Sequence, residues 1–272
     1  MNRRFLTLAA TASAALIALT ACGGTGDDAG ASSPQSGGLT LAQVQDAGKL
    51  VIATEGTYRP FSFHEGGTGE LTGYDVEVAT AVAEKLGVQP EFQETQWDAI
   101  FAGLESGRFD VIANQVSITP AREEVYSFSE PYTVSRGVIV TTADTTDISS
   151  FADLEGKTTA QSLTSNWAEL ARESGALIEG VEGWAQSVAL LEQGRVDATI
   201  NDQLTYLDYQ NTNGNQNIKV AAETEETSLS AFAFRQGSDD LVAAVDAALG
   251  ELAADGTLAE LSDKYFGADV SK

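Results

Sequence analysis

Cysteine, histidine and basic residues are scarce in this chain of 272 residues, and each scarcity excludes a class of site. A single Cys cannot form an internal disulfide, and one Cys with one His cannot supply a Cys/His zinc site or a CxxC redox pair. We therefore expect neither a metal nor a cofactor. The 15 Lys and Arg residues stand against 40 Asp and Glu residues, which gives a formal charge of -25. Nucleic-acid binding rests on clustered Lys and Arg that displace counterions from phosphates, so we expect no nucleic-acid partner.

The N-terminal segment is too short for a membrane span. Its 17 uncharged residues, Phe5–Ala21, follow two Arg residues and are diluted by Ala, Thr and Ser, whereas a spanning helix needs about 20 strongly apolar residues. Such a segment is typical of an export signal, which we predict over 1–21. The quartet Leu19-Thr20-Ala21-Cys22 resembles the bacterial lipobox, in which the Cys thiol carries diacylglycerol. Acyl chains on Cys22 would anchor the protein on the extracytoplasmic face of the cell membrane; a plain secretory signal is the alternative.

A polar spacer follows the predicted signal. Residues 23–38 are small or polar and include no large apolar side chain. Such a stretch cannot bury enough surface to offset its ordering entropy, so we predict a flexible tether over 22–38 and a fold that begins near Leu39. The chain as a whole is 43% hydrophobic, with 11 Phe, 7 Tyr and 3 Trp, which is enough for a sizeable core.

Short runs rich in β-branched residues alternate with helical patterns after the tether. In the helical stretches apolar residues recur at i, i+3, i+4 and i+7, and Gly87 and Gly107 follow as C-terminal caps. The predicted elements are strands over 49–54, 90–94 and 109–113 and helices over 75–86 and 97–106. Strands that alternate with helices imply βαβ units with parallel sheets covered on both faces, so the predicted fold class is α/β.

An internal repeat indicates two similar halves. Trp97–Gln115 aligns without gaps on Trp184–Asp202, and 8 of the 19 positions are identical. The shared Leu-Glu-x-Gly-Arg-x-Asp core has the pattern of a helix end, a Gly turn and an entering strand, which predicts two α/β lobes. Chance similarity of two amphipathic segments is the alternative.

Polar side chains gather at the predicted carboxyl ends of strands in both halves. Ligands of open α/β sheets bind at such ends, and two facing ends would form a cleft. Arg122 could pair with a carboxylate, the helix that opens at Ser165-Asn166 offers free N–H groups to an anion, and Asp202 could accept from an ammonium group. Together they predict an α-amino-acid site. The candidate residues are Glu55, Tyr58, Trp97, Asn114, Gln115, Ser117, Thr119, Arg122, Ser165, Asn166 and Asp202.

Each candidate also has a plainer interpretation. An Arg after a Thr-Pro turn is often a surface ion pair, a Trp on a helical stripe often belongs to the core, and an Asp at a strand end is often a helix N-cap. The convergence of all these residue types on strand ends in both halves favours the binding site.

Five separated segments resemble the polar amino-acid-binding proteins of ABC importers, a family of bacterial solute-binding proteins. They are GTYRPFSF (56–63), LTGYDVEVATAVAEKLGV (71–88), WDAIFAGLESGRFDVIANQVSIT (97–119), YSFSEPYTVS (126–135) and DGTLAELSDKYFGADV (255–270). The resemblance runs over essentially the whole chain from Leu39. It implies a two-lobe periplasmic-binding-protein fold of type II, no enzymatic activity, and delivery of a ligand to a membrane permease with a cytoplasmic ATPase. We expect a monomer.

Within the family the chain is most similar to the cystine-binding branch. The similarity is carried by TEGTY (54–58), TQWDA (95–99), ANQVSIT (113–119) and the terminal KYFGADV. The resemblance implies that Arg122 binds the ligand carboxylate and Asp202 its ammonium group. Tyr58 and Trp97 then form the aromatic walls of the site, and Ser117 and Thr119 the family's T/S-x-T turn.

The chain departs from the family pattern at two places. Many relatives have Gly-Thr before the second-lobe helix, where this chain has Thr164-Ser165-Asn166-Trp167. The family pattern therefore does not determine the backbone conformation of this segment. Gln115 stands where glutamine and histidine binders often have a small residue, which favours a different pocket. Cystine carries two ammonium groups, and Glu55 would suit the distal one. Glutamine and arginine are the alternative ligands.

The resemblance places two crossings between lobes, near 132–136 and 226–230. It divides the chain into a first lobe, 39–133 and 231–272, and a second lobe, 134–230, which close around a ligand by a hinge.

The rival function is an enzyme like cyclohexadienyl dehydratase, with Glu55 and Asp202 as an acid/base pair. The sensing domain of a receptor is a third possibility. We favour the importer protein, because a lipid anchor with a long tether fits capture for a neighbouring permease.

Overall fold

The computed structural model of the chain describes residues 37–214 and 216–272. The predicted export signal, Cys22 and the predicted tether up to residue 36 lie outside the described residues. Within those two ranges, no helix combines the length and the apolar character that crossing a membrane requires.

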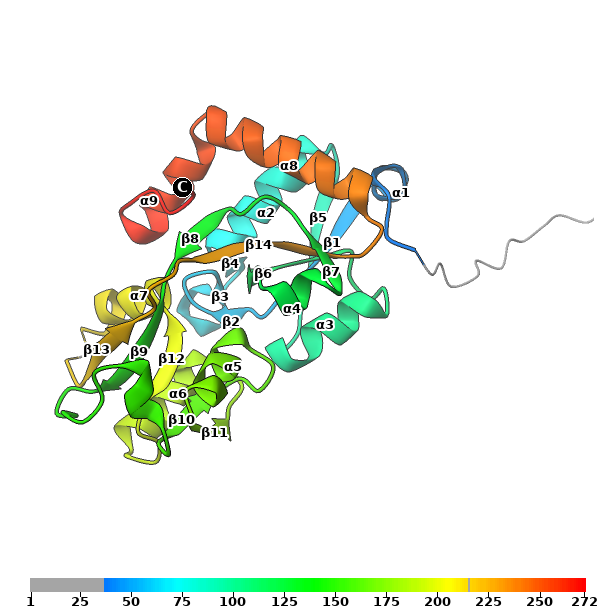
Figure 1. Cartoon of the computed structure of the whole chain (residues 1–272). Coiled ribbons are helices and arrows are strands. Elements are labelled where there is room, and N and C mark those ends of the chain that lie inside the picture. The colour runs from blue at the N-terminus through cyan, green and yellow to red at the C-terminus, as the bar shows by residue number, and fades with distance from the viewer. Residues whose placement is uncertain (1–36, 215) are drawn as a thin grey trace, which may run out of the picture. The chain divides into compact units, whose positions relative to one another are not determined.

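Helices and strands alternate along most of the described chain (Figure 1). The helices are α1 (Leu41–Ala47), α2 (Tyr74–Lys85), α3 (Trp97–Glu105), α4 (Pro120–Glu123), α5 (Asn166–Glu173), α6 (Trp184–Glu192), α7 (Gln203–Asn213), α8 (Asp239–Ala254) and α9 (Thr257–Phe266), with short 3-10 turns at Glu65–Gly67 and Phe151–Leu154. The strands are β1 (Lys49–Thr54), β2 (Thr57–Tyr58), β3 (Ser62–His64), β4 (Leu71–Thr72), β5 (Gln89–Glu94), β6 (Val111–Ser117), β7 (Tyr126–Phe128), β8 (Thr133–Ser135), β9 (Gly137–Thr142), β10 (Thr158–Gln161), β11 (Leu177–Gly180), β12 (Thr199–Asp202), β13 (Ile218–Glu223) and β14 (Ser228–Arg235). The predicted α/β class is confirmed.

The first lobe, as we use the term, is the six-stranded sheet with the small β2-β3-β4 sheet and helices α1 to α4, α8 and α9. The strand order is β5-β1-β6-β14-β7, and β8 pairs with β14. β1 runs parallel to β5 and β6, whereas β14 runs antiparallel to β6. The expectation of purely parallel sheets is therefore wrong. β14 enters at the carboxyl edge, where Ser230 pairs with Ser117 at the end of β6, so it can cross the sheet only in the opposite direction.

The second lobe, which comprises β9 to β13 and α5 to α7, repeats this order. β10 is parallel to β11, and a bridge between Thr159 and Ala198 joins β10 to the start of β12. β9 pairs antiparallel with β12 on one side and with β13 on the other. The order β11-β10-β12-β9-β13 thus corresponds to β5-β1-β6-β14-β7 of the first lobe. This correspondence supports the internal repeat over chance similarity.

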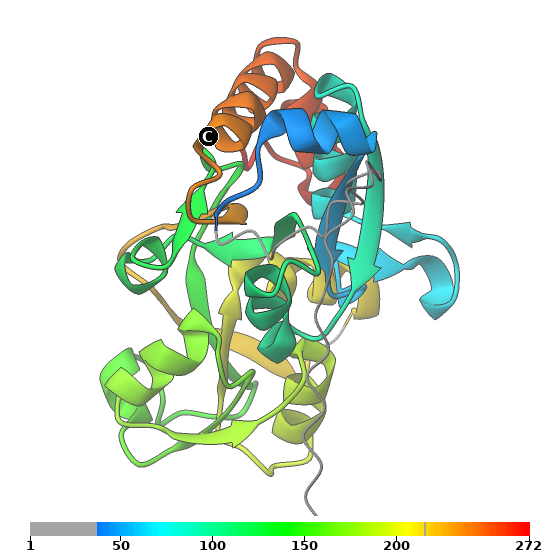
Figure 2. The ribbon, with the colours of Figure 1, turned by 90° about the vertical axis from the view of Figure 1, so that its right-hand side faces the viewer.

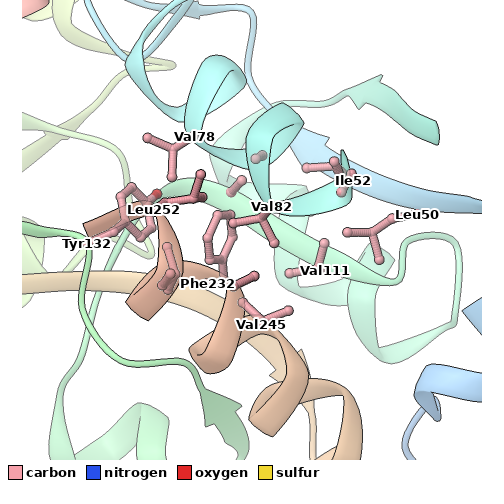
Figure 3. Packing of buried hydrophobic residues seen from close by; sticks show 14 of the residues in the cluster. Leu50, Ile52, Val78, Val82, Val111, Tyr132, Phe232, Val245 and Leu252 are labelled. Atoms are coloured by element: carbon pink, nitrogen blue, oxygen red, sulfur yellow. The ribbon is translucent and has the colours of Figure 1, made fainter. Parts of the chain in front are cut away.

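Helices cover both faces of the six-stranded sheet, as the sequence predicted. Alternate residues of a strand point to opposite faces, and the side chains of β1 accordingly contribute to two hydrophobic cores. Leu50 and Ile52 belong to the core that Val82 of α2 and Val245 of α8 complete (Figure 3). Ala53 belongs to a second core, with Trp97, Ile100 and Leu104 of α3. Burial on both faces fixes the strand register, and with it the place of the polar residues at the strand ends.

Most predicted element bounds agree with the structure to within about two residues, which is the usual scatter of element ends. The strand predicted over 109–113 is the exception, because β6 runs over Val111–Ser117. Asn114, Gln115 and Ser117 therefore lie within a strand rather than in the loop after it. The strand was predicted to end at residue 113 because the run of apolar residues ends there. In the structure every residue of β6 is buried, and the pairing of β6 with β14 continues to Ser117.

The two predicted crossings lie side by side. β8 pairs antiparallel with the start of β14, with Thr133 opposite Ser230 and Ser135 opposite Ser228. The two crossings thus form one hydrogen-bonded ribbon. The predicted lobe boundaries, 133/134 and 230/231, stay a prediction.

The start of the described chain is attached to the first lobe. Leu39 N donates to Ser238 Oγ at 3.0 Å, and Leu41 N donates to Asp240 Oδ2 at 3.3 Å. Helix α1 consequently contacts α8 (Figure 2). Thr40 and Gln43 cap α1 reciprocally, since each side chain accepts from the backbone N–H of the other.

Candidate functional site

A cavity lies between the carboxyl ends of strands from both lobes. Seven of the predicted site residues line it, namely Glu55, Tyr58, Trp97, Asn114, Gln115, Ser165 and Asn166. The second lobe also contributes Gln161, Ser162, Trp167, Gly183, Trp184, Ser187, Ile200 and Asn201. The structure therefore brings most of the predicted residues together at one place.

A more open hollow adjoins this cavity. Ser117 and Thr119 line the hollow, and Asn166 and Trp167 line both spaces. Arg122 and Asp202 line neither of the two. The Arg122 guanidinium lies over the ring of Trp97, and Asp202 follows Asn201 in the chain; Trp97 and Asn201 both line the cavity. Nine of the eleven predicted residues thus line a cleft with a closed part and an open part.

Arg122 presents a cation that has no acidic partner among the described residues. It lies in α4, whose N-cap Thr119 accepts from Arg122 N through Oγ1 at 3.3 Å. Nη1 donates to Ser117 O at 2.9 Å, and the guanidinium lies over the rings of Trp97 and Phe101, 5.3 and 5.2 Å from their centroids. Burial lowers the pKa of Arg122 to about 10. A desolvated guanidinium with spare donors is suited to a carboxylate.

Asp202 is the last residue of β12 and the N-cap of α7. Its Oδ1 accepts from Leu204 N at 2.8 Å and from Ser135 Oγ at 2.7 Å. The plainer interpretation of a strand-end Asp is thus confirmed, and a role toward ammonium stays a prediction. Asp202 is only 3% exposed, and burial raises its pKa to about 6. A nearby cation would favour the ionised carboxylate.

Glu55 and Asn114 form a polar unit in the first-lobe wall. Asn114 Nδ2 donates to Glu55 Oε2 at 2.7 Å, while Asn114 Oδ1 accepts from Thr54 Oγ1 at 2.9 Å and from Glu55 N at 2.8 Å. Burial, with a small contribution from the negative charge of Asp98, raises the pKa of Glu55 to about 7, against the lowering effect of its hydrogen bond with Asn114. Asn114 therefore positions a carboxyl group whose charge a cationic ligand would stabilise.

Gln115 is held in an unusual conformation by Asp75, a residue that the sequence reasoning missed. Its φ of 49° lies in the left-handed region, which costs about 1 kcal/mol or more for a residue with a side chain. Asp75 accepts from Gln115 N at 2.8 Å and from Gln115 Nε2 at 2.6 Å. Burial raises the pKa of Asp75 to about 7. No sequence signal marked Asp75, because an acid in the first turn of a helix is usually solvated.

Hydrogen bonds and an ion pair join the lobes across the cleft. They are Tyr58 Oη to Asn201 Oδ1 (3.0 Å), Thr164 Oγ1 to Asp98 Oδ1 (2.7 Å) and Arg59 Nε with Asp208 Oδ2 (3.3 Å). Tyr58, predicted as a wall, is thus also a contact between lobes. The Thr164 hydroxyl makes a contact with Asp98 that the family's Gly could not make, while the backbone Thr164 N donates to Asp98 Oδ1 at 3.1 Å as well.

The second-lobe helix opens where the sequence predicted. Ser165 is the N-cap of α5, and its Oγ accepts from Ala168 N at 3.0 Å. Asn166 begins the helix, so its backbone N–H is one of the free donors of the first turn. Trp184 and Gln161 in the same lobe were missed as site residues. The internal repeat could have found Trp184, because it aligns with Trp97.

Metal ligands do not gather at this site or elsewhere in the described ranges. Across residues 37–214 and 216–272, no group of three His, Cys, Asp or Glu side chains is placed to hold a metal ion.

Comparison with known proteins extends the resemblance seen in the sequence. The chain is 52% identical over 257 residues to the L-cystine-binding protein TcyA of Bacillus subtilis, covering 94% of this chain and 95% of that protein. The L-cystine solute receptor of Neisseria gonorrhoeae in its unliganded open conformation is 47% identical, with 85% of this chain and 99% of that chain covered and a TM-score of 0.58.

A structure with a bound ligand agrees better in geometry despite lower identity. An ancestral arginine-binding protein bound to arginine is 33% identical, with 81% of this chain and 99% of that chain covered and a TM-score of 0.75. Residues 50–268 match the sequence family described as bacterial extracellular solute-binding proteins, family 3. With its repeated strand order, its cleft between two lobes and this match over most of its length, the chain belongs to the bacterial extracellular solute-binding proteins of family 3.

Proposed function

We propose that this protein is the substrate-binding component of an amino-acid ABC importer and that L-cystine is its ligand. The observation that carries the proposal is a pair of opposite charges, one in each lobe, at or just after the end of equivalent strands. Arg122 follows β6 in the first lobe, and Asp202 ends β12 in the second. An α-amino acid bridges these charges, with its carboxylate on Arg122 and its ammonium group on Asp202. The similarity to TcyA supports cystine as the particular amino acid.

Ligand capture proceeds by closure of the two lobes. Each lobe alone offers half of the charge pair, so a bridging ligand gains both sets of contacts only in the closed arrangement and shifts the population toward it. We infer that the described arrangement is the closed one. The contacts between lobes support this inference, as does the higher TM-score with the arginine-bound protein than with the unliganded open receptor.

Glu55 accepts the distal ammonium group of cystine in this proposal. It lines the closed part of the cleft, and no Lys or Arg is among the residues that line this cavity. Its pKa of about 7 means that a cationic partner would complete its ionisation near neutral pH. This arrangement favours cystine over glutamine, which has no distal ammonium group.

A calorimetric screen of the purified chain against L-cystine, L-arginine and L-glutamine tests the ligand. We expect L-cystine to bind most tightly, and in a thermal-shift assay at 100 times its Kd to stabilise the protein by about 2.7 kcal/mol. Binding of arginine or glutamine without cystine would overturn the ligand assignment. Binding of none of them would overturn the proposed function.

Attachment to the membrane follows from the predicted lipobox. We propose that Cys22 carries the lipid anchor and that the protein delivers its ligand, as a monomer, to a permease with its ATPase. Fractionation of cells that express the chain and its Cys22→Ser variant tests the anchor. We expect the unaltered chain in the membrane fraction and the variant in the soluble fraction. Equal distribution of the two would overturn the lipid anchor.

We infer further that the chain binds its ligand without converting it. The relative that covers 94% of the chain is described as a binding protein, and Asp202 already serves as a helix cap. Incubation with prephenate or arogenate, the substrates expected of the rival enzyme, should yield no product. Turnover that is lost in the Glu55→Gln variant would overturn this inference.

A further inference from the structure

Unpartnered polar atoms gather in the wall of the cavity between the lobes. In the described part of the chain, six buried side-chain N or O atoms make no hydrogen bond. Four of them belong to residues that line this cavity: Trp97 Nε1, Gln115 Oε1, Gln161 Nε2 and Trp184 Nε1. These side chains are at most 8% exposed. A buried polar atom without a partner destabilises a fold, and native proteins keep few of them, so a cluster around one cavity points to a ligand.

The second-lobe members of this cluster are donors. The indole N–H of Trp184 and the amide group of Gln161 can each donate to a ligand. Gln161 ends β10 and Trp184 begins α6, and Val181 N, between them, donates to Gln161 O at 3.1 Å. The N-cap of α6 is Gly183, which lines the cavity and has no side chain to cap the helix. The first N–H groups of α6 thus add to a set of donors that suits an anion.

The first-lobe side of the cavity offers two acceptors beside the unpaired indole N–H of Trp97. Gln115 Nε2 is committed to Asp75 Oδ1 at 2.6 Å and to Thr133 Oγ1 at 3.0 Å, which leaves Oε1 as the free end of the amide. Glu55 stands in the same wall, oriented by Asn114. An amide oxygen and a carboxylate together suit an ammonium group.

We propose that Gln161, Trp184 and the start of α6 form a subsite for the distal carboxylate of a ligand that has two α-amino-acid ends. Gln115 and Glu55, facing it, accept from the distal ammonium group. This subsite differs from the proximal anion site, because Arg122 does not line this cavity. It deepens the proposed function and rests on it. A ligand with an amine but no carboxylate at its distal end leaves the second-lobe donors unpaired, so the subsite selects against such a ligand.

Calorimetry with two ligands isolates the distal carboxylate. One is L-cystine, and the other is the mixed disulfide of L-cysteine and cysteamine, which keeps the distal amine and lacks the distal carboxylate. We expect the unaltered chain to bind L-cystine at least about tenfold more tightly than the mixed disulfide, since a hydrogen bond to a charged group is worth that much or more. The Trp184→Phe and Gln161→Met variants should each lose most of this preference and keep their affinity for the mixed disulfide.

Matched controls separate this proposal from a general loss of structure. Gln193→Ala alters an exposed residue that ends the same helix, and it should leave both affinities unchanged. Thermal melting of each variant reports whether it folds. An equal loss of affinity for both ligands in Trp184→Phe and in Gln161→Met would overturn the subsite while the proposed function stands. Failure of the unaltered chain to bind either ligand would overturn both.

Discussion

The two halves of the internal repeat fold in the same way, yet a cation follows the last strand of the first half and an anion ends the last strand of the second. α3 and α6 both begin with Trp, and two residues after the end of each helix stands a Gly with positive φ, 72° at Gly107 and 67° at Gly194. Each repeat then uses an Asp to fix the neighbouring strand. Asp110 Oδ2 accepts from Val51 N at 2.8 Å, and Asp197 Oδ2 accepts from Thr158 N at 2.8 Å.

Beyond this shared frame the repeats diverge. β6 leads into the turn that carries Arg122, whereas β12 ends on Asp202. The cation and the anion stand at different positions of the scaffold, Arg122 five residues beyond the end of β6 and Asp202 at the end of β12, where the repeat aligns it with Gln115. A cleft that presents both charges suits a zwitterion. The comparison shows that the shared Leu-Glu-x-Gly-Arg-x-Asp core of the repeat specifies the frame, while the residues at the end of each repeat and beyond it differ in charge.

The largest expected effect comes from removing the charges in which the repeats differ. Arg122→Ala and Asp202→Asn should each weaken L-cystine binding by about 2–5 kcal/mol, because each leaves the opposite ligand charge unpaired in a desolvated site. Asn is as good an N-cap as Asp, so Asp202→Asn should keep its melting temperature. The measurement is calorimetry, with the double variant to test for coupling. Unchanged affinity in either single variant would contradict the opposite-charge comparison.

The second prediction concerns the Asp residues that the repeats share. Asp110→Ala should lower the free energy of unfolding by about 1–3 kcal/mol, because it leaves a partly buried N–H of Val51 unpaired. Asp197→Ala should cost less than about 1 kcal/mol, since water can reach the exposed Thr158 N–H. Urea unfolding of both variants gives the two values. Equal losses would show that the two frames are also energetically equivalent.

The third prediction uses pH to distinguish the acids of the two lobes. Glu55 has a pKa of about 7 and Asp202 of about 6, both raised by burial. Each must lose its proton to pair with an ammonium group, so affinity for L-cystine should rise by about a hundredfold between pH 5.5 and 7.5, mostly through Glu55. Glu55→Gln should flatten the upper part of this profile and keep the rise near pH 6. A profile that Glu55→Gln leaves unaltered would remove Glu55 from the site.

The same raised pKa values oppose stability in the absence of ligand. A carboxyl group that holds its proton more tightly in the folded state favours folding at low pH, and this contribution is lost as pH rises through the folded pKa. For Glu55 the window runs from its ordinary pKa of 4.5 up to about 7. Thermal melting of the unliganded chain should therefore show a weaker fall over this window in Glu55→Gln than in the unaltered chain.

The smallest expected effect is at a position where only the first repeat reaches across the cleft. Asp98 accepts from Thr164, whereas the second repeat has Ala185 at the equivalent position. Asp98→Ala should weaken L-cystine binding by about 0.5–1.5 kcal/mol, as expected for a single exposed hydrogen-bonded contact. Asp98→Asn keeps the acceptor oxygen and serves as the matched control. If Asp98→Ala binds as tightly as Asp98→Asn, this contact does not stabilise the closed form.

Sequence periodicity predicted the parts of the fold in which burial has a regular spacing. β1 was predicted to the residue and α2 and α3 to within one, because one face of each helix and both faces of the strand are apolar. The antiparallel direction of β14 was not predicted, since periodicity carries no information on strand order or direction. The full length of β6 was not predicted either, because Asn114, Gln115 and Ser117 are polar yet buried, and the apolar pattern stops before them.

The site was predictable where a residue type has one obvious chemical use. Arg122 and Asp202 stood out as charges at strand ends, and their roles toward a ligand stay predictions. Asp75 was invisible because its partner, Gln115, is 40 residues away along the chain. The cap function of Asp202 and the contact between Tyr58 and Asn201 likewise depend on tertiary placement.

The ribbon formed by β8 and the start of β14 limits how the cleft can move. Its backbone hydrogen bonds resist sliding of one crossing past the other, because a slip of one residue would turn buried side chains such as Thr133 and Ser230 outward. With sliding resisted, the lobes can move only if the ribbon bends, and the two crossings must then bend together. Every ligand that closes the cleft would bring the lobes along one path to one end point. A permease could therefore recognise occupancy from a single shape, whichever amino acid is inside.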